Sequence, residues 1–517
     1  MEEVKKYTNI YLTKSNKKIY KNIFYSYILP NDVINVEYLN ENICTIKNLV
    51  SRKELVTIGI IHRSFMNCYL TLPFVSEVYS YPIQDISQNG EVVMVKTKVN
   101  TFDVEILGYY GNISNLKNIK FAIRSLININ TPLLEYYSTS LPKISTHKYT
   151  DDYKDLTHLN TFSVDPGGTK DIDDCISLDG STVYVHITDI CKNFEIGSLT
   201  DLYALNRATN LYLIDNTFSC IKRCISRNYS LLLNEKRDVI TVEFVINMDG
   251  DIIPNSVKIY ESTIINKKNY TYEEFNDKIN NVDILHFIKK WIIQGFDIPS
   301  QKLNIVNGII TFSLNDNNDL AHKFIETMMI VTNIIITNRL DKLKIKIPYK
   351  NHPKKVMNYV HTDDLFTKYL FYLNEKSNTE SIKNGHFGLP IINYSTFTSP
   401  IRKYNDILLH RLMKGYVYDD KLMDMIISHL KYKEKLVKRI GKWYFNLVLK
   451  KYLRYNWNYI TDGRVIVNDN SVGIFIDKWM LYVKLKYDKK NENLKTGDVL
   501  KVIPRMITPY GIFLEYF

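Results

Sequence analysis

Four carboxylates lie close together in one short stretch of the sequence. They are Asp165, Asp171, Asp173 and Asp174, and a Pro-Gly-Gly turn separates the first from the other three. If the turn brings these side chains within about 4–6 Å of one another, either some are protonated or a divalent cation neutralises them. Oxygen ligands with no histidine or cysteine among them suit Mg²⁺ or Mn²⁺, and carboxylate-held Mg²⁺ pairs serve phosphodiester hydrolysis.

The residues alone leave an alternative open for this stretch, because a solvated acidic turn would have the same composition. A calcium-binding loop fits poorly, since Cys175 stands where an oxygen ligand is needed and no Gly-x₅-Glu pattern follows. Val164 and Ile172 are interleaved with the acids. Their presence favours a partly buried segment over a surface tail.

A second stretch with chemical potential is Phe-Thr-Ser-Pro-Ile-Arg-Lys-Tyr at 397–404. Ser399 is a good N-cap and Pro400 suits a first helical position, so the pattern predicts a helix from there to Gly415. Arg402 would then lie in the first turn, where free N–H groups and the helix dipole attract anions. Its guanidinium could hold a phosphate through two hydrogen bonds, whereas an arginine on a solvated helix face is the alternative.

The elements that must position these residues form a predicted α+β fold. Short β segments dominate 1–150 and 463–517, which favours small barrels at both ends. An alternating run at 182–189 and a hairpin pattern at 239–260 predict a sheet in the centre. Apolar residues at helical spacing predict helices at 321–340 and about 422–455, in addition to the one after Ser399.

Composition narrows the class of protein. The chain is 45% hydrophobic and 24% charged, which excludes a disordered or collagen-like chain. Its net charge of +12 favours a polyanionic partner, nucleic acid before membrane. No run of about 18 apolar residues and no signal-peptide pattern occurs, and the six cysteines are scattered. We therefore expect a cytoplasmic protein in a reducing compartment, with no membrane contact.

The motifs resemble those of the ribonuclease II/ribonuclease R family of exoribonucleases, whose catalytic domain is called RNB. The stretch Thr161–Asp174 is similar to the family's acidic motif almost position for position. Further similar motifs follow in the family's order at 185–189, 209–213, 325–326, 385–389 and 398–404.

The resemblance implies 3′→5′ hydrolysis of single-stranded RNA to nucleoside 5′-monophosphates, with two Mg²⁺ ions. We also expect a monomer, with protein partners left open. It also implies a layout of four domains. An RNB catalytic domain at 151–457 would be flanked by OB-type β-barrels. Two of these would be cold-shock-like, at 1–75 and 76–150, and one S1-like, at 458–517.

The resemblance also assigns residues by position. Asp165, Asp171, Asp173 and Asp174 are similar to the family's metal-site aspartates, and Asp173 is expected to be catalytic. Arg402 resembles the catalytic arginine that contacts the scissile phosphate and the RNA.

Three further residues would contact RNA. Tyr212 resembles the aromatic residue that holds the 3′-terminal nucleotide, Tyr272 a tyrosine that lines the RNA path, and Glu326 an acid that contacts a ribose hydroxyl. One family glutamate near the start of the last catalytic-domain helix has no counterpart, and Glu434 is the nearest acid. The first alternative function is a catalytically silent RNA-binding or regulatory protein that retains the fold. A DNA exonuclease is the third option.

Overall fold

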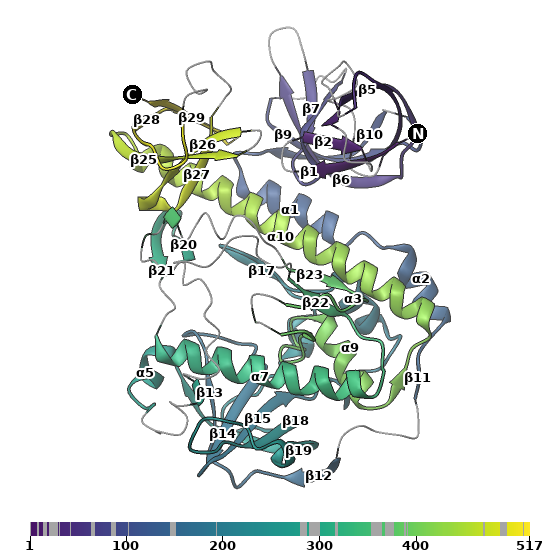
Figure 1. Ribbon diagram of the computed structural model, residues 1–517, viewed down its shortest axis with the longest axis vertical. Coiled ribbons are helices and arrows are strands. Elements are labelled where there is room, and N and C mark those ends of the chain that lie inside the picture. Colours follow the sequence, from purple (N-terminus) through teal and green to yellow (C-terminus); the bar gives the residue numbers. More distant parts are fainter. Residues whose placement is uncertain are drawn as a thin grey trace.

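The computed structural model has a lower body built on a mixed sheet, with three small β units above it (Figure 1). The structure describes residues 2–7, 10–13, 18–19, 29, 32–41, 43–63, 68–83, 89–101, 103–144, 151–192, 194–279, 287–288, 300–315, 319–352, 364, 366–367, 377–386, 389, 391–468, 471–485, 494–509 and 511–516. The mixed α+β class predicted from the sequence is confirmed.

The first β unit is a closed five-stranded barrel in the order β1-β2-β3-β5-β4. Its strands are β1 (Glu2–Tyr7), β2 (Ile10–Thr13), β3 (Lys18–Ile19), β4 (Val33–Tyr38) and β5 (Ile43–Ser51). The second unit is a five-stranded sheet in the order β10-β9-β6-β7-β8. Its strands are β6 (Leu55–Arg63), β7 (Cys68–Leu72), β8 (Ser76–Pro82), β9 (Glu91–Thr97) and β10 (Val104–Asn112). The expected division at residue 75 therefore falls between two paired strands of one sheet, β7 and β8.

Two helices follow where only β structure was expected up to residue 150. They are α1 (Leu116–Ile127) and α2 (Pro132–Thr139). In α1, Ile119, Ile123 and Leu126 are buried on one face, and the Asn115 side chain accepts a hydrogen bond from the N–H of Lys117. The all-β prediction was wrong here, because these apolar residues follow the helical repeat and not the alternation of a strand.

The body is organised around a six-stranded sheet in the order β12-β19-β13-β14-β15-β18. Its strands are β12 (Asp151–Asp155), β13 (Thr161–Val164), β14 (Asp174–Asp179), β15 (Thr182–Thr188), β18 (Lys236–Val245) and β19 (Lys258–Tyr270). The predicted hairpin is confirmed, since β18 and β19 are antiparallel with Glu243 opposite Lys258. The alternating run is confirmed too, because Val183, Val185 and Ile187 are buried in the core.

Smaller elements complete the body and connect it to the barrels. They are β11 (Lys143–Ile144), η2 (Ile190–Lys192), α3 (Leu199–Arg207), β16 (Leu211–Leu213), β17 (Asn216–Phe218), α4 (Arg223–Ser226), η3 (Pro254–Ser256), α5 (Tyr272–Asn276), β20 (Ser300–Val306), β21 (Ile309–Asn315), β22 (Tyr349–Asn351), β23 (Asn378–Glu380) and β24 (Tyr416–Val417).

Three further helices cover and cross the body. They are α7 (Leu320–Lys342), α9 (Tyr404–Met413) and α10 (Asp420–Asn456). Every residue of α9 is buried. Among the described helices, α7 alone is long and apolar enough to span a membrane by composition, and 56% of its most apolar window is buried inside the molecule. Helix α10 runs obliquely between the body and the β units, so it contacts both (Figure 1).

The C-terminal unit is a five-stranded sheet in the order β27-β26-β25-β28-β29. Its elements are β25 (Thr461–Asn468), β26 (Ser471–Ile476), η4 (Asp477–Trp479), β27 (Leu481–Lys484), β28 (Val499–Ile507) and β29 (Ile512–Tyr516), as the sequence predicted. The end of α10 is joined to this sheet by Arg454, whose Nε donates to the C=O of Ile507 at 3.0 Å.

A buried polar cluster joins α2, α3 and α9. Nη2 of Arg411 donates to Oδ1 of Asp201 at 2.8 Å, and both side chains are 0% exposed. The hydroxyls of Tyr404 and Tyr137 donate to the two oxygens of Asp201 at 3.0 and 3.1 Å. A buried ion pair is tolerated when most of its remaining donors and acceptors are satisfied, and in this pair Nε of Arg411 is the atom that has no partner among the described residues. The cluster fixes α9, and with it the segment that precedes α9.

Replacing Arg411 with methionine should destabilise the body by about 3–5 kcal/mol, because Asp201 would be left as a buried charge without its cation. Urea unfolding followed by circular dichroism would measure the loss. The control is Lys501→Met, which removes an exposed partner of Asp462, 2.6 Å away, and should change stability little. Equal losses in the two variants would contradict the assignment.

Candidate active site

The acidic stretch forms the loop between the paired strands β13 and β14, at one end of the central sheet. Asp165 directly follows β13, and Asp174 is the first residue of β14. The N–H and the hydroxyl of Thr169 both donate to the C=O of Pro166, at 3.1 and 2.7 Å. Gly168 takes a φ of +82°, a conformation that glycine adopts without steric cost. This turn folds the chain back toward its starting strand.

Three of the four aspartates share one electrostatic environment. Burial raises the pKa of Asp174 to about 8, and the charges of Asp165 and Asp173 add to the rise. Burial also raises the pKa of Asp165, although the Arg402 guanidinium acts in the opposite direction. In such a group the fully ionised state is unfavourable unless more positive charge is present.

Asp173 connects this loop to a segment 229 residues further along the chain. Its Oδ1 accepts a hydrogen bond from the N–H of Ile401 at 2.8 Å, and its Oδ2 accepts one from Nε of Arg402 at 3.2 Å. The residue is 4% exposed. Burial raises the pKa of Asp173 to about 7, even though the Arg402 charge and the Ile401 N–H favour its ionised form. The contact holds the acidic loop against Arg402.

Arg402 lies in a turn before α9, and the prediction that it belongs to the first turn of a helix was wrong. The helix begins at Tyr404, because Lys403 is still extended with φ −141° and ψ 123°. Asp406 within α9 accepts the N–H of Ser399 at 2.8 Å. The C=O of Ser399 in turn accepts the N–H of Arg402 at 3.2 Å. The serine and proline therefore open a turn that is held by the helix, and the helix itself starts later.

The guanidinium of Arg402 has donors beyond its contact with Asp173. Its side chain is 42% exposed, and apart from Nε its nitrogens make no hydrogen bond to the described residues. Burial opposes its charge, but the carboxylates of Asp173 and Asp174 raise the pKa of Arg402 above its usual value. Arg402 is thus a permanent cation with donors available to an anion.

Asp171 has a hydrogen-bond partner of its own at the site. Its Oδ1 accepts a hydrogen bond from the hydroxyl of Ser226 on α4, at 2.8 Å. Asp171 and Asp173 both lie near Tyr212, because their charges add to the rise that burial produces in its pKa. Three of the four predicted aspartates therefore interact electrostatically with Arg402, and Asp171 lies with Asp173 near Tyr212.

Tyr212 stands on β16 with its side chain 57% exposed. Its hydroxyl accepts a hydrogen bond from Nδ2 of Asn210 at 3.0 Å. The N–H of Asn210 donates to the C=O of Arg402 at 2.9 Å, and its Oδ1 accepts the N–H of Cys220 at 2.6 Å. Asn210 thus joins Tyr212 to the arginine turn. The sequence analysis missed this residue, whose only signal was its position two residues before the tyrosine.

Tyr272 also lies beside the aspartates, as the first residue of α5. Burial raises its pKa to about 12, and the charges of Asp165 and Asp174 add to the rise. The ring is stacked on the imidazole of His322, with centroids 3.7 Å apart and an interplanar angle of 7°. Nδ1 of His322 lies 2.6 Å from Oδ2 of Asp319. His322 is a second residue that the sequence analysis missed.

The two glutamates of interest have different surroundings. Glu326 is an exposed residue of α7, one turn after His322. Glu434 on α10 is bound by Nζ of Lys350, 2.6 Å from both of its oxygens, and it accepts the hydroxyl of Thr379 at 2.7 Å. Burial opposes its charge, but Lys350 lowers the pKa of Glu434.

Phe387 and Gly388 of the 385–389 motif lie outside the described residues.

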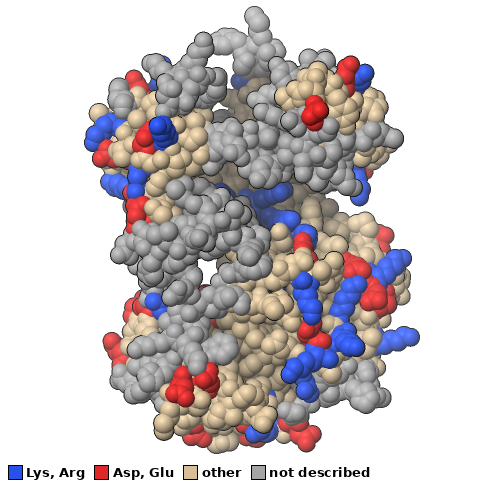
Figure 2. Space-filling model, viewed as in Figure 1, with Lys and Arg blue, Asp and Glu red and all other residues tan. Residues whose placement is uncertain are grey.

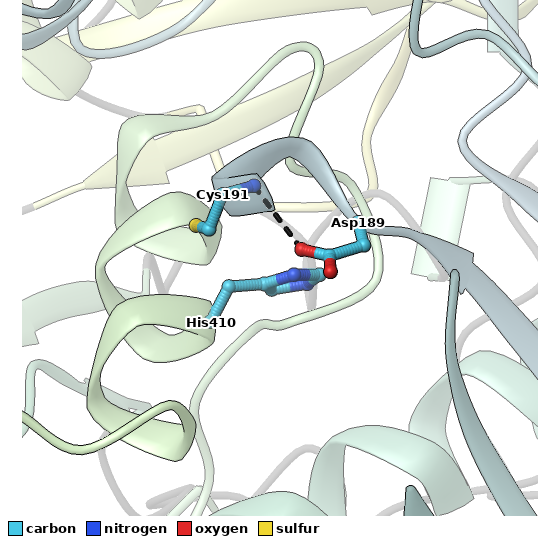
Figure 3. A group of neighbouring side chains, drawn as sticks. All are labelled: Asp189, Cys191 and His410. Carbon is cyan, nitrogen blue, oxygen red and sulfur yellow. Dashed lines mark hydrogen bonds between the residues drawn. The ribbon is translucent and has the colours of Figure 1, made fainter. Parts of the chain in front are cut away.

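Among the described residues, one group of three potential metal ligands has all its ligand atoms within 4.8 Å of one another, namely Asp189, Cys191 and His410, whereas the aspartates of the acidic loop are spaced more widely. In Figure 3 the imidazole of His410 lies below the carboxylate of Asp189, and the sulfur of Cys191 points away from that carboxylate. Asp189 is already bound by Nζ of Lys414 at 2.6 Å, and Nε2 of His410 is 3.1 Å from the C=O of Phe397. Asp189 is thus paired with a lysine and His410 contacts a backbone carbonyl. Two of the three groups already have partners, so this cluster does not suit a metal centre.

The structure has the features of an RNB-type protein. These are an acidic loop at one end of a mixed sheet, an arginine turn before a buried helix, and small β units at both ends of the chain. The model of the RNB domain matches residues 153–419, which is slightly more than half of the chain. The chain therefore belongs to the RNB domain family.

Curated relatives are 25–29% identical to this chain over the part of the sequence that can be aligned. Ribonuclease R of Thermotoga maritima is 25% identical over 63% of this chain and 56% of its own length. Exoribonuclease 2 of Buchnera aphidicola subsp. Schizaphis graminum is 26% identical over 64% of both chains. Ribonuclease R of Buchnera aphidicola subsp. Acyrthosiphon pisum is 29% identical over 66% of this chain and 56% of its own length. The chain thus spans about 56–64% of these relatives.

Solved structures share the fold over nearly the whole chain. Mycoplasma genitalium RNase R in complex with ribose methylated single-stranded RNA has a TM-score of 0.75 at 17% identity, and the match covers 100% of both chains. Yeast Ssd1, a pseudonuclease, has a TM-score of 0.70 at 12% identity and is covered to 81%, against 97% of this chain. The fold therefore occurs both in a ribonuclease and in a pseudonuclease.

Proposed function

We propose that this protein is a 3′→5′ exoribonuclease that hydrolyses single-stranded RNA and releases nucleoside 5′-monophosphates. The observation that carries the proposal is the convergence of Asp165, Asp173 and Asp174 on Arg402, next to the exposed ring of Tyr212. A turn of acids beside a cation with available donors suits a phosphodiester whose charge grows during hydrolysis. The names of the curated relatives support the same activity.

The donor set of the site fits magnesium. Asp165 and Asp174 supply carboxylate oxygens, and their crowding is the situation that a hard divalent cation relieves. Asp171 would join them at the edge of the site, while Asp173 supports them from its contact with Arg402. When bound, Mg²⁺ supplies the charge that lowers the pKa of an attacking water and stabilises the leaving oxygen. Mn²⁺ has the same oxygen preference.

The remaining residues would bind and orient the RNA. Arg402 would donate to the scissile phosphate, with its position set by Asp173. Tyr212 would hold the 3′-terminal nucleotide through its exposed ring, since aromatic rings stack on bases of any sequence. Tyr272 would line the end of the path, and Glu326 would contact a ribose hydroxyl, a group that distinguishes RNA from DNA.

Basic side chains on α10 suit the approach of the RNA backbone. Burial and then the neighbouring cations Lys431, Arg439 and Lys438 lower the pKa of Lys435, so these four residues lie close together. Figure 2 shows Lys and Arg side chains in the hollow between the upper units and the body. Phosphates that neutralise such a group release counterions, so RNA binding by this surface would weaken with salt.

The first prediction concerns Asp173. Asp173→Asn should reduce shortening of 5′-labelled single-stranded RNA by at least about 10²-fold, because the lost charge acts at the phosphate where charge develops in the transition state. RNA affinity should change little, because Tyr212 and the basic side chains of α10 still contact the RNA. Denaturing gels and filter binding would measure the two quantities. The matched control is Asp179→Asn, at the other end of β14, which should behave like the wild type. RNA that is bound but never shortened by the wild type would favour a silent protein like the pseudonuclease.

The second prediction concerns magnesium. Mg²⁺ at about 100 times its dissociation constant should stabilise the wild type by about 2.7 kcal/mol, because it binds only the folded acids. The double variant Asp165→Asn/Asp174→Asn should show no such stabilisation, whereas Asp179→Asn should retain it. Thermal melts with and without Mg²⁺ would measure the shift. An identical shift in the double variant would place the cation elsewhere.

The third prediction concerns Tyr212. Tyr212→Ala should lengthen the shortest RNA left at the end of digestion, because the last nucleotides would lose the ring that holds them. Sequencing gels of the end products would show the change. Tyr432→Phe, on the half-exposed face of α10, is the control and should leave the end product unaltered. An unchanged end product in Tyr212→Ala would remove this residue from the site.

A further inference from the structure

The hairpin that carries Tyr212 is tethered at its turn by a single side chain. Strands β16 and β17 pair from Leu211 to Leu213, and Asp215 lies in the two-residue turn between them. Nζ of Lys120 on α1 lies 2.6 Å from Oδ2 of Asp215. The hydroxyl of Tyr444 on α10 donates to Oδ1 of the same carboxylate at 2.7 Å.

These contacts are only partly open to water. The side chains of Lys120 and Asp215 are 25% and 21% exposed, and Tyr444 is fully buried. Charge-assisted hydrogen bonds in such a setting are stronger than exposed ion pairs. Asp215 therefore joins α1, which follows the second β unit, to α10, which crosses the body.

The apolar side of the hairpin is packed on the same two helices. Leu211 and Leu213 belong to one buried cluster with Ile123 of α1 and Ile440 of α10. Gly441 of α10 lies beneath the hairpin, since a Cβ there would be in ordinary van der Waals contact with Cδ1 of Leu211 at 3.8 Å and with the C=O of Tyr212 at 3.9 Å. The base of the hairpin is fixed separately, through Asn210 and the C=O of Arg402.

We infer that Asp215 is a positioning residue, which sets the distance of the Tyr212 ring from the Arg402–Asp173 pair and thereby the length of the shortest product. The inference rests on the proposed function, because it assigns Tyr212 to the 3′-terminal nucleotide. Besides its apolar packing on α1 and α10, the hairpin has a polar contact at each end, with Asn210 at its base and Asp215 at its tip. Releasing the tip leaves the base attached, so the ring shifts while the acids and Arg402 stay in place.

The test uses the full chain with Asp215→Asn, Lys120→Met and Tyr444→Phe. Each should shorten a long 5′-labelled RNA at an initial rate within about twofold of the wild type, yet leave an end product at least one nucleotide longer. Asp424→Asn is the matched control, since it removes another lysine contact of α10, to Lys346 at 2.8 Å. A double variant, Asp215→Asn/Tyr212→Ala, should give the same end product as Tyr212→Ala, because the aspartate acts through the tyrosine.

A second readout does not depend on cleavage. RNA with 2-aminopurine as its 3′-terminal base would be bound in EDTA, where stacking on Tyr212 quenches its fluorescence. Asp215→Asn should quench less than the wild type, and Asp424→Asn equally. If the wild type shortens RNA but Asp215→Asn gives the same end product and the same quenching, the inference about Asp215 is wrong and the proposed function still holds. If the wild type quenches but never shortens RNA, the proposed function fails, and the quenching of Asp215→Asn then decides the inference.

A purely structural role would look different. Melting temperature and initial rate would then fall together in Asp215→Asn, with the end product unchanged, and that result would overturn the inference. Absence of quenching by the wild type itself would also overturn it, because Tyr212 would not contact the terminal base.

Discussion

The candidate site depends on one buried contact, in which Asp173 meets Ile401 and Arg402. The backbone of Asp173 is held by the sheet, since its C=O accepts the N–H of Thr188 at 2.9 Å. Its side chain is held by a segment from the other end of the body. Removing this carboxylate from water is unfavourable, and the two hydrogen bonds offset part of that cost. The acids and Arg402 can therefore face each other only while the sheet and α9 keep their relative position.

That relative position is fixed by side chains remote from the acids. Helix α9 is buried over its whole length, and Arg411 binds Asp201 where water is excluded. Because Asp406 holds Ser399, the arginine turn moves with α9 as one unit. Helix α10 extends the same arrangement to the outer units, since it packs on β16 and on β28. The geometry of the site is thus a consequence of helix packing across the whole chain, and the acidic loop contributes only one side of it.

The sequence predicted the parts of this arrangement that follow from local pattern. The central sheet, α7, α10 and the C-terminal strands have clear periodicity, and they form where it indicates. Helices α1 and α2 were missed because short strands on either side dominated the pattern of the N-terminal region. The start of α9 was placed too early, since the serine and proline of a turn look the same in sequence as those of a helix start. The carboxylate of Asp406 decides where the helix starts, because it accepts the N–H of Ser399 and holds residues 399–403 in a turn. Asn210 and His322 were missed for the same reason, because hydrogen bonds and ring stacking between distant elements leave no repeat in the sequence.

The fold alone does not separate a nuclease from a pseudonuclease, because both share it with this chain. The electrostatics of the site bear on the choice. A protein that only binds RNA gains nothing from buried carboxylates that raise one another's pKa, because unneutralised acids repel phosphate. Crowded acids destabilise the folded state when they ionise. We therefore expect them at positions where a function requires them. Arg402 neutralises one of the three converging acids by direct contact. A divalent cation would favour the ionised forms of Asp165 and Asp174, whose pKa values are raised without it, and this supports the proposed hydrolysis over RNA binding alone.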